Sequence, residues 1–559
     1  MRRLIKYGVV IATCCLAAAA CSSNSSSSTS GGGGAKASGT LTIDNESGGN
    51  WTCQFSTFSG ASQGFALGFV YEPLMFVNAL QNQKTTPWLA TSYAWSNGDK
   101  TLTFTIRNGV KFTNGDPMTA ADVVYTFNLL KKNPTLDLNA IWTVLSSVTQ
   151  SGSNQVVVQF KAPALTYFYY IADQVGIVDQ KVWSKISDPT KFTDPNPIGT
   201  GPYMTGAHSC APQNIKYTAN PHYWQPGLPK VETIEYPAFL TNDTANNFMA
   251  QGNMQWGGQF IPDITKFLAG QPAIKWWFPG VANVSMFINL TNPILKNVAV
   301  RQAMAYAVNR PKASQLGEFG EEPPSNQTDI VTPTYSSWLD TAQAAAYGNN
   351  YAFNPQKAIS ILTKAGFTRG SDGIFAKGGQ KLSFTILNNG GFSDWVNAVN
   401  VIVANLKAVG IQVTPQDLSQ TTYQNKLFAG QFQLAYGSEG GGPSPYFELR
   451  QLLYSANSAA IGTPAGSNYE RYSNKATDNL ILAFPQTTSL SQQQSIINQL
   501  QKVMLSDVPV IPVTQSVDWF QYDTSKFTGW PTPSDPFAQP APYNAPDWEV
   551  VMLHLTPVK

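Results

Sequence analysis

Residues with the types and spacing for catalysis lie in the segment Gly60-Ala-Ser62-Gln-Gly64. This is the spacing of a nucleophile elbow, in which a tight turn between a strand and a helix exposes a serine to a histidine and an acid. The chain has three histidines, and His554 lies near the C-terminus, where such a partner could sit. A secreted serine hydrolase using Ser62 is therefore an open alternative, although short glycine-rich segments also produce this pattern by chance.

Other catalytic and metal-binding patterns are missing from the sequence. His208, His222 and His554 are not paired at ligand spacing, and the chain has no HExxH motif, phosphate-binding glycine loop or paired-cysteine motif. The acids Glu321 and Glu322 lie beside prolines in an expected loop, so we interpret them as solvated charges rather than a glycosidase pair. We expect no metal site, no cofactor and no enzymatic activity.

The N-terminus has the pattern of an export signal followed by a tether. Three basic residues precede an apolar run that ends at Ala20 and is too short to span a bilayer. Cys21 directly follows Ala18, Ala19 and Ala20, which resembles the lipobox of bacterial lipoproteins, and a Ser/Gly tract comes next. We expect a signal peptide over 1–20, a lipid on Cys21, a tether over 21–37, and a lipid-anchored protein on the outer face of the membrane or in the periplasm. An ordinary secretory peptide cut near Ala20 is the alternative.

Two further cysteines, Cys53 and Cys210, remain in the expected mature chain. An exported protein occupies compartments in which disulfides persist, so we predict that these two residues pair. Two buried free thiols are the alternative.

The composition narrows the class of partner. Charged residues are 12% of the chain and leave a net charge of +2, so no strong field of one sign is available to hold nucleic acid. The chain contains 14 Trp, which supply flat faces with a polar edge. About 520 residues remain after the tether, which exceeds one hydrophobic core and predicts two or three domains.

The periodicity of apolar residues predicts alternating strands and helices, which is typical of an α/β protein. Strands are expected over 40–44, 101–107, 155–160, 281–290 and 508–517, and helices over 120–130, 298–309 and 489–505. Another helix is expected to start with Ser393 as its cap, bury Trp395, Val399 and Ile402 on one face, and end at Gly410.

These segments, taken in order, resemble the extracytoplasmic solute-binding proteins of ABC importers, in the family that handles peptides, nickel and some oligosaccharides. The most specific match is LTFTIRNGVKFTNGDPMTAADVVYTFNL at Leu102–Leu129, and shorter matches are 71–74, 199–203, 220–224 and 300–310. The resemblance implies a monomeric binding protein that works with permease and ATPase subunits.

The resemblance also implies a two-lobed α/β hinge fold of the type II periplasmic-binding-protein kind, with an inserted subdomain. We expect lobe I to comprise 38–75, 180–283 and 515–559, the inserted subdomain 76–179, and lobe II 284–514. Ligand would bind in the cleft between the lobes.

Family position also points to the ligand-binding residues. They are loop residues expected to face the cleft, namely Asn45, Trp51, Trp256, Asn388, Trp395, Tyr436, Ser438, Glu439 and Trp519. In peptide-binding relatives an Asp near the segment 436–446 captures the ligand's amino terminus, whereas this chain has only Glu439 there. The run Gly440–Gly442 with Trp395 looks more like the branch that binds cello- or manno-oligosaccharides. Oligopeptide and oligosaccharide are near parity, with a slight preference for sugar.

Overall fold

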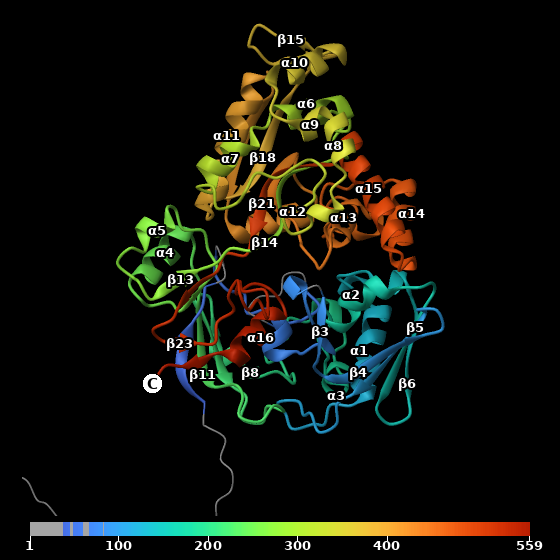
Figure 1. Ribbon diagram of the computed structural model, residues 1–559, viewed down its shortest axis with the longest axis vertical. Helices are drawn as coiled ribbons and strands as arrows, with labels where there is room; N and C mark the ends of the chain where they lie inside the picture. The colour runs from blue at the N-terminus through green and yellow to red at the C-terminus, as the bar shows by residue number, and fades with distance from the viewer. Residues whose placement is uncertain (1–36, 45–48, 60–65, 82) are drawn as a thin grey trace, which may run out of the picture.

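The chain folds into two lobes joined by two adjacent chain crossings (Figure 1). The computed structural model describes residues 37–44, 49–59, 66–81 and 83–559. The lower lobe in Figure 1 is lobe I and holds the first described strand and the C-terminus, and the upper one is lobe II. This is the predicted two-lobed α/β hinge fold. The predictions for the signal peptide, Cys21, Asn45 and Ser62 fall outside the described residues.

The main sheet of lobe I has the order β1-β11-β10-β8, with β9 beside β10. Its strands are β1 (Ser38–Thr42), β8 (Tyr203–Met204), β9 (Cys210–Ala211), β10 (Asn214–Ala219) and β11 (Val231–Pro237). Strand β1 is parallel to β11, and Leu41, Ile215, Ile234 and Tyr236 are buried. Cys53 and Cys210 form a disulfide that ties the loop after β1 to β9.

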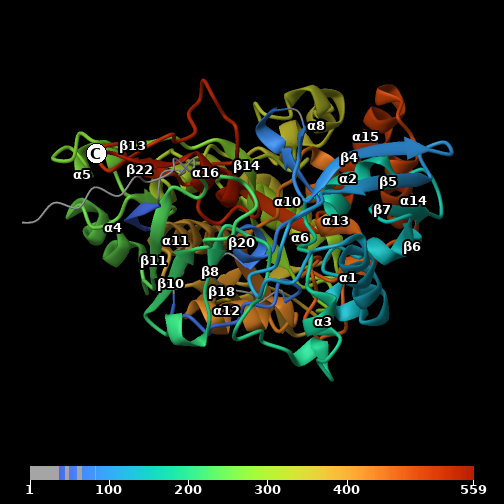
Figure 2. The same cartoon turned by 90° about the horizontal axis from the view of Figure 1, so that it is seen from below.

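A second sheet of lobe I, with the order β4-β5-β7-β6, forms a peripheral part. It consists of β4 (Ala90–Ser96), β5 (Thr101–Ile106), β6 (Leu145–Ser151) and β7 (Gln155–Phe160), and α1 (Ala120–Lys132) packs on it. Leu102, Phe104 and Ile106 alternate inward along β5, as the sequence pattern predicts. Figure 2 shows this part at one end of the molecule and α4 and α5 at the other.

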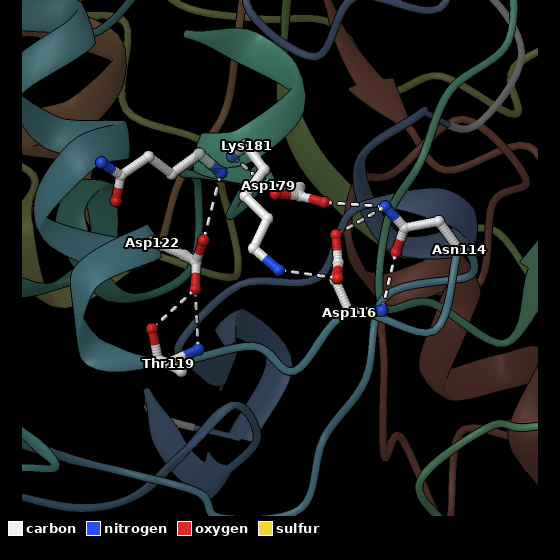
Figure 3. Close-up of polar contacts among 7 residues, drawn as sticks. Asn114, Asp116, Thr119, Asp122, Asp179 and Lys181 are labelled. Atoms are coloured by element: carbon white, nitrogen blue, oxygen red, sulfur yellow. Dashed lines mark hydrogen bonds and ion pairs between the residues drawn. The ribbon is translucent and has the colours of Figure 1, made fainter.

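The start of α1 is fixed by polar contacts within the segment that resembles the family most closely (Figure 3). The Asp122 carboxylate accepts hydrogen bonds from the main-chain N–H and hydroxyl of Thr119, both at 2.8 Å, as part of a capping box at the start of the helix. Its other oxygen accepts from the N–H of Gln180 at 3.1 Å, which joins α1 to α3 (Gln180–Trp183). Lys181 and Asp116 form an exposed ion pair at 2.7 Å. This network therefore stabilises the periphery of lobe I.

Lobe II is built on a sheet with the order β19-β18-β20-β14-β21. Its strands are β14 (Gly280–Ile288), β18 (Ser383–Asn389), β19 (Gln412–Leu418), β20 (Leu434–Ser438) and β21 (Val510–Val517). Helices α6 (Val298–Ala307), α11 (Ser393–Ala408) and α15 (Leu490–Asp507) lie near the predicted bounds. The prediction of Ser393 as a cap is wrong: Phe392 is the N-cap and Ser393 is the first helical residue.

The two chain crossings are the lower ends of β14 and β21, which pair antiparallel. In lobe I they continue as β13 (Ile274–Trp276) and β22 (Gln521–Asp523), which also pair. Strand β21 is the edge of its sheet, so Pro512 removes no inner ladder bond, and the register shifts beside it. The predicted start at Val508 is two residues early, because Val508 takes a left-handed conformation at the end of α15.

The remaining α-helices and strands are short. The other helices are α2 (Phe168–Ala172), α4 (Asn242–Ala250), α5 (Ile264–Phe267), α7 (Arg310–Gly317), α8 (Thr341–Ala346), α9 (Gly348–Tyr351), α10 (Pro355–Lys364), α12 (Gln420–Phe428), α13 (Pro445–Leu453), α14 (Lys475–Ala483) and α16 (Asp547–His554). The other strands are β2 (Met75–Asn78), β3 (Lys84–Pro87), β12 (Trp256–Gly257), β15 (Thr368–Arg369), β16 (Phe375–Lys377), β17 (Gln380–Lys381), β23 (Phe527–Thr528) and β24 (Thr556–Pro557). None of the described helices has the length and apolar character needed to cross a bilayer.

Candidate functional site

A cavity of about 400 Å³ lies between the two lobes, beside the crossing strands. This volume is within the range of about 300–1,000 Å³ that is usual for small-ligand sites. Lobe II contributes Glu322, Trp395 and the segment Ser438–Gly442, and the crossings contribute Val281, Ala282, Ser516 and Val517. Lobe I contributes Tyr169, Gln174, Asp518, Trp519, Gln539, Tyr543, Asn544 and Ala545. Both lobes must therefore approach each other to complete the cavity.

The lobe II wall presents the indole of Trp395 from the first turn of α11. The ring packs edge-on against Phe392, Tyr423 and Tyr436, with centroid distances of 5.0, 6.1 and 5.7 Å. Only 8% of Trp395 is exposed, so the aromatic cluster fixes its orientation. Tyr436, one of the predicted ligand-binding residues, packs against Trp395 and does not itself line the cavity.

An acidic cluster lies at the lobe II wall and includes the lining residue Glu439. Carboxylate oxygens of Asp329, Glu439 and Glu448 lie within 4.8 Å of one another, which is also a spacing that a hard cation such as Ca²⁺ could use. The Asn283 amide donates to Asp329 and to Glu448, at 3.1 Å each. Both oxygens of Glu439 are buried without a hydrogen-bond partner among the described residues. Burial raises the pKa of Glu439 to about 7, and burial together with the neighbouring Glu439 carboxylate raises the pKa values of Asp329 and Glu448 well above their usual range.

The lobe I wall presents Trp519, which packs edge-on against Phe260 and Phe278. Its main-chain N–H donates to the Tyr543 hydroxyl at 2.9 Å, and that hydroxyl donates to the carbonyl of Val517 at 3.3 Å. The Asn544 amide donates to Asp518 at 2.8 Å. This wall therefore has an internal network of hydrogen bonds that holds its shape.

The electrostatics of the cavity are one-sided. Glu322, Glu439 and Asp518 line it, and the described lining residues include no Lys, Arg or His. Burial raises the pKa of Glu322 to about 8 and that of Asp518 to about 7. Ionised, these groups accept hydrogen bonds, and protonated they also donate. The cavity suits hydroxyl or ammonium groups and offers no cation to a ligand carboxylate.

Of the predicted ligand-binding residues, the structure brings Trp395, Ser438, Glu439 and Trp519 together around the cavity. Asn388 lies outside it and donates to Asp417 at 3.0 Å within lobe II. Trp51 and Trp256 also lie outside the lining. The indole N–H of Trp51 donates to the carbonyl of Tyr236, and that of Trp256 to the carbonyl of Pro540, so both are held in the core of lobe I.

Several lining residues were missed by the sequence analysis. Gln539, Tyr543 and Asn544 come from a proline-rich segment near the C-terminus, where amides and an aromatic ring on a stiff loop were the available signal. The interpretation of Glu322 as a solvated charge is wrong: it is 2% exposed, because its carboxylate accepts a hydrogen bond from Thr514 on β21 at 2.7 Å.

Comparison with known proteins identifies the family to which this chain belongs. The family model of bacterial extracellular solute-binding proteins, family 5 (middle region), matches residues 84–460, which is more than half of the chain. The chain belongs to this family. It is therefore a binding protein and not an enzyme, and the hydrolase alternative with Ser62 as nucleophile is wrong. At the level of the family, it is the extracytoplasmic substrate-binding protein of an ABC importer of the peptide class.

Individual relatives are more distant. The oligopeptide-binding protein AppA of Bacillus subtilis is 24% identical over 75% of this chain and 76% of its own length. Its structure with a nonapeptide has a TM-score of 0.80 and 20% identity, and covers 94% of this chain and 100% of that one. A mannohexaose-bound periplasmic oligopeptide-binding protein of Thermotoga maritima has a TM-score of 0.86 and 24% identity, with coverages of 93% and 98%. These likenesses establish the fold.

Proposed function

We propose that this protein captures a short, uncharged oligosaccharide in the cavity between its lobes and delivers it to an ABC permease. The observation that carries the proposal is the lining itself, with two indoles, three carboxylates and no cationic side chain among the described lining residues. Sugar rings present apolar CH faces that pack against indoles, and their hydroxyls pair with carboxylates and amides. An oligopeptide would leave its terminal carboxylate without a charged partner here.

An oligopeptide is the second candidate, and Glu439 is the observation that favours it. Its buried carboxylate is the acid of the segment 436–446 and could accept a charge-assisted hydrogen bond from an ammonium group. Similar proteins are described with either ligand, mannohexaose in one case and a nonapeptide in the other. The absence of a cation in the described lining gives the sugar its slight preference.

Calorimetric titration tests this choice directly. The mature protein is titrated with manno-oligosaccharides, cello-oligosaccharides and peptides of two to five residues. We expect heat with one of the two sugar series. Heat with peptides alone would transfer the function to the second candidate, and catalytic turnover of any of these compounds would contradict a binding protein.

We further propose that the protein is a monomer anchored by a lipid on Cys21, with the lobe boundaries given above. The Ser/Gly tract would then act as a flexible tether that raises the effective concentration of the protein near its permease. Metabolic labelling with palmitate tests the anchor. Label in the wild type and none in Cys21→Ser is the expected result, and label retained by Cys21→Ser would exclude this site.

A further inference from the structure

A buried arginine of lobe II contacts residues of lobe I. Arg450 lies on α13 of lobe II and is 1% exposed. Its guanidinium lies 5.5 Å from the ring centroid of Tyr167 and 5.1 Å from that of Tyr170, both in lobe I, and 5.2 Å from that of Tyr454. It also donates to the carbonyl of Asn139, in lobe I, at 3.0 Å. Two aromatic rings and one carbonyl of lobe I, together with one aromatic ring of lobe II, thus enclose the positive charge of Arg450.

This charge has no carboxylate in an ion pair. The ion pairs in the described part of the chain all lie elsewhere, and the Nε of Arg450 is buried without a hydrogen-bond partner there. Asp137, which interacts electrostatically with Arg450, instead accepts the main-chain N–H groups of Ile141 and Trp142 at 2.9 Å each, which shapes the loop that presents the Asn139 carbonyl. Since a desolvated charge needs compensation, Arg450 depends on the rings of both lobes.

The helix that carries Arg450 is continuous with the cavity wall. Ser438–Gly442 lines the cavity and leads directly into α13 (Pro445–Leu453), and Figure 1 shows α13 above α2 where the lobes meet. Phe447 on α13 packs edge-on against Tyr169 and Tyr170, with both centroids at 5.1 Å, and Tyr169 itself lines the cavity. The position of α13 against lobe I therefore sets the position of the lobe II wall.

We propose that Arg450 is a positioning residue that sets ligand affinity without touching the ligand, by docking α13 of lobe II on Tyr167 and Tyr170 of lobe I in the closed state. The inference rests on the proposed capture of ligand between the lobes. When the cleft opens, the guanidinium loses two of its three rings and is solvated instead. Apparent affinity scales with the population of the closed state, so a weaker dock lowers affinity even with an intact cavity.

The chain offers a matched control in Arg471. It is also buried, and its guanidinium donates to the carbonyls of Tyr469, Phe428 and Thr463, all within lobe II. Arg450→Met and Arg471→Met each remove one buried guanidinium, but only the first removes a contact between the lobes. Arg450→Lys keeps a cation over the rings and is expected to retain part of the effect.

The experiment measures the populations of open and closed states directly. Spin labels are placed at the exposed positions Lys132→Cys and Lys475→Cys, one in each lobe, in the mature chain with Cys21→Ser. Distances are recorded by double electron–electron resonance with no ligand and with mannohexaose, cellohexaose or pentaalanine, and affinity is measured by calorimetry on the same proteins. We expect Arg450→Met to lower the closed-to-open ratio and the affinity by about tenfold, whereas Arg471→Met lowers only the thermal stability.

The outcomes separate the two proposals. If Arg450→Met is folded and closes with ligand as the wild type does, the docking role of Arg450 is wrong while the function stands. If Arg450→Met is too unstable to label, Tyr170→Leu removes the ring from the lobe I side, and unchanged closure in that variant overturns the role. If none of the three compounds closes the wild type or releases heat, the proposed function fails, and the inference fails with it.

Discussion

The two walls of the cavity differ in how far their polar groups are already satisfied. On the lobe I wall, Tyr543 accepts from the N–H of Trp519 and Asn544 donates to one oxygen of Asp518, while the other oxygen of Asp518 is buried without a partner in the described part of the chain. On the lobe II wall, both oxygens of Glu439 are buried without a partner in the described part of the chain. A group that lacks a partner gains more from a ligand than a group that already has one. We therefore expect the lobe I wall to be formed before the ligand binds. The lobe II wall is expected to supply the additional affinity for ligand that favours the closed state.

Removing the indole of the lobe II wall is expected to have the largest effect. Trp395→Ala deletes the only aromatic face that lobe II adds to the described lining, and we expect affinity to fall about thirtyfold or more, as for a binding hot spot. The variant also loses contacts with Phe392 and Tyr436, so stability falls by about 3–5 kcal/mol. Calorimetry at low temperature, with circular dichroism to check folding, separates the two effects.

The matched control is Trp51→Phe, which removes the hydrogen bond to the Tyr236 carbonyl within lobe I. It is expected to lower stability and leave affinity unchanged. A folded Trp395→Ala protein with wild-type affinity would show that the lobe II wall does not provide the indole contact.

The next effect concerns the glycine run of the same wall. A Cβ atom on Gly441 would lie 2.6 Å from the carbonyl oxygen of Val281, which belongs to a crossing strand. Backbone cannot move aside easily, so Gly441→Ala is expected to displace the wall and cost about 1–3 kcal/mol of stability, with weaker binding. Urea unfolding and calorimetry measure both.

Gly440→Ala is the control for this change. Its Cβ atom would meet the end of the Gln451 side chain, which can rotate away. We expect a stability change within about 0.5 kcal/mol. Equal losses in the two variants would mean that the crossing strand does not constrain this wall.

The sequence predicted the lobe II wall better than the lobe I wall, and the reason is local. Trp395 and Val399 recur at helical spacing, and the glycine run and Glu439 are neighbours within one short segment, so nearby residues alone indicate their positions. Tyr543 and Asn544 instead reach the cavity because the C-terminal segment folds back on the crossing strands. No pattern within that segment specifies this contact.

Two tryptophans predicted to face the cleft lie in the core of lobe I instead, and they show a different limit of prediction from sequence. Trp51 and Trp256 lie in or beside loops, as Trp519 does, and residue type and position do not distinguish them. Each of the two is held by a distant main-chain carbonyl, at Tyr236 and at Pro540. Tertiary partners far along the chain therefore decide which indole lines a cavity and which fills a core.

The pH dependence of stability offers another comparison of the lobe I and lobe II walls. Burial raises the pKa of Glu439 from 4.5 to about 7, so the folded state keeps a proton that the unfolded chain releases. The stability that this group contributes is complete below pH 4.5 and is lost as pH rises through 7. We expect thermal stability to fall between pH 5 and 8, with about 2 kcal/mol from Glu439, and Glu439→Gln to flatten this fall.

Asp518 on the lobe I wall is the matched group, since burial raises its pKa to about 7 as well. Asp518→Asn is expected to flatten the pH profile of stability as Glu439→Gln does. Of these two variants, only Glu439→Gln is expected to weaken ligand binding substantially. The exposed Asp372, paired with Lys381, serves as a control, and Asp372→Asn leaves the fall intact. A steeper fall in Glu439→Gln than in the wild type would contradict the assigned direction.

The smallest effect is expected from a change in the lobe I wall. Tyr543→Phe removes the hydroxyl that accepts from the N–H of Trp519 and donates to the carbonyl of Val517, which costs about 1 kcal/mol of stability. The ring that faces the ligand remains, so affinity is expected to change less than threefold. Tyr469→Phe, whose hydroxyl makes one exposed contact at 3.4 Å with Gly466, is the control and changes neither quantity measurably. If Tyr543→Phe instead weakens binding as strongly as Trp395→Ala, the lobe I wall contributes directly to affinity, because the ligand then depends on the more fully paired lobe I wall as much as on the lobe II wall.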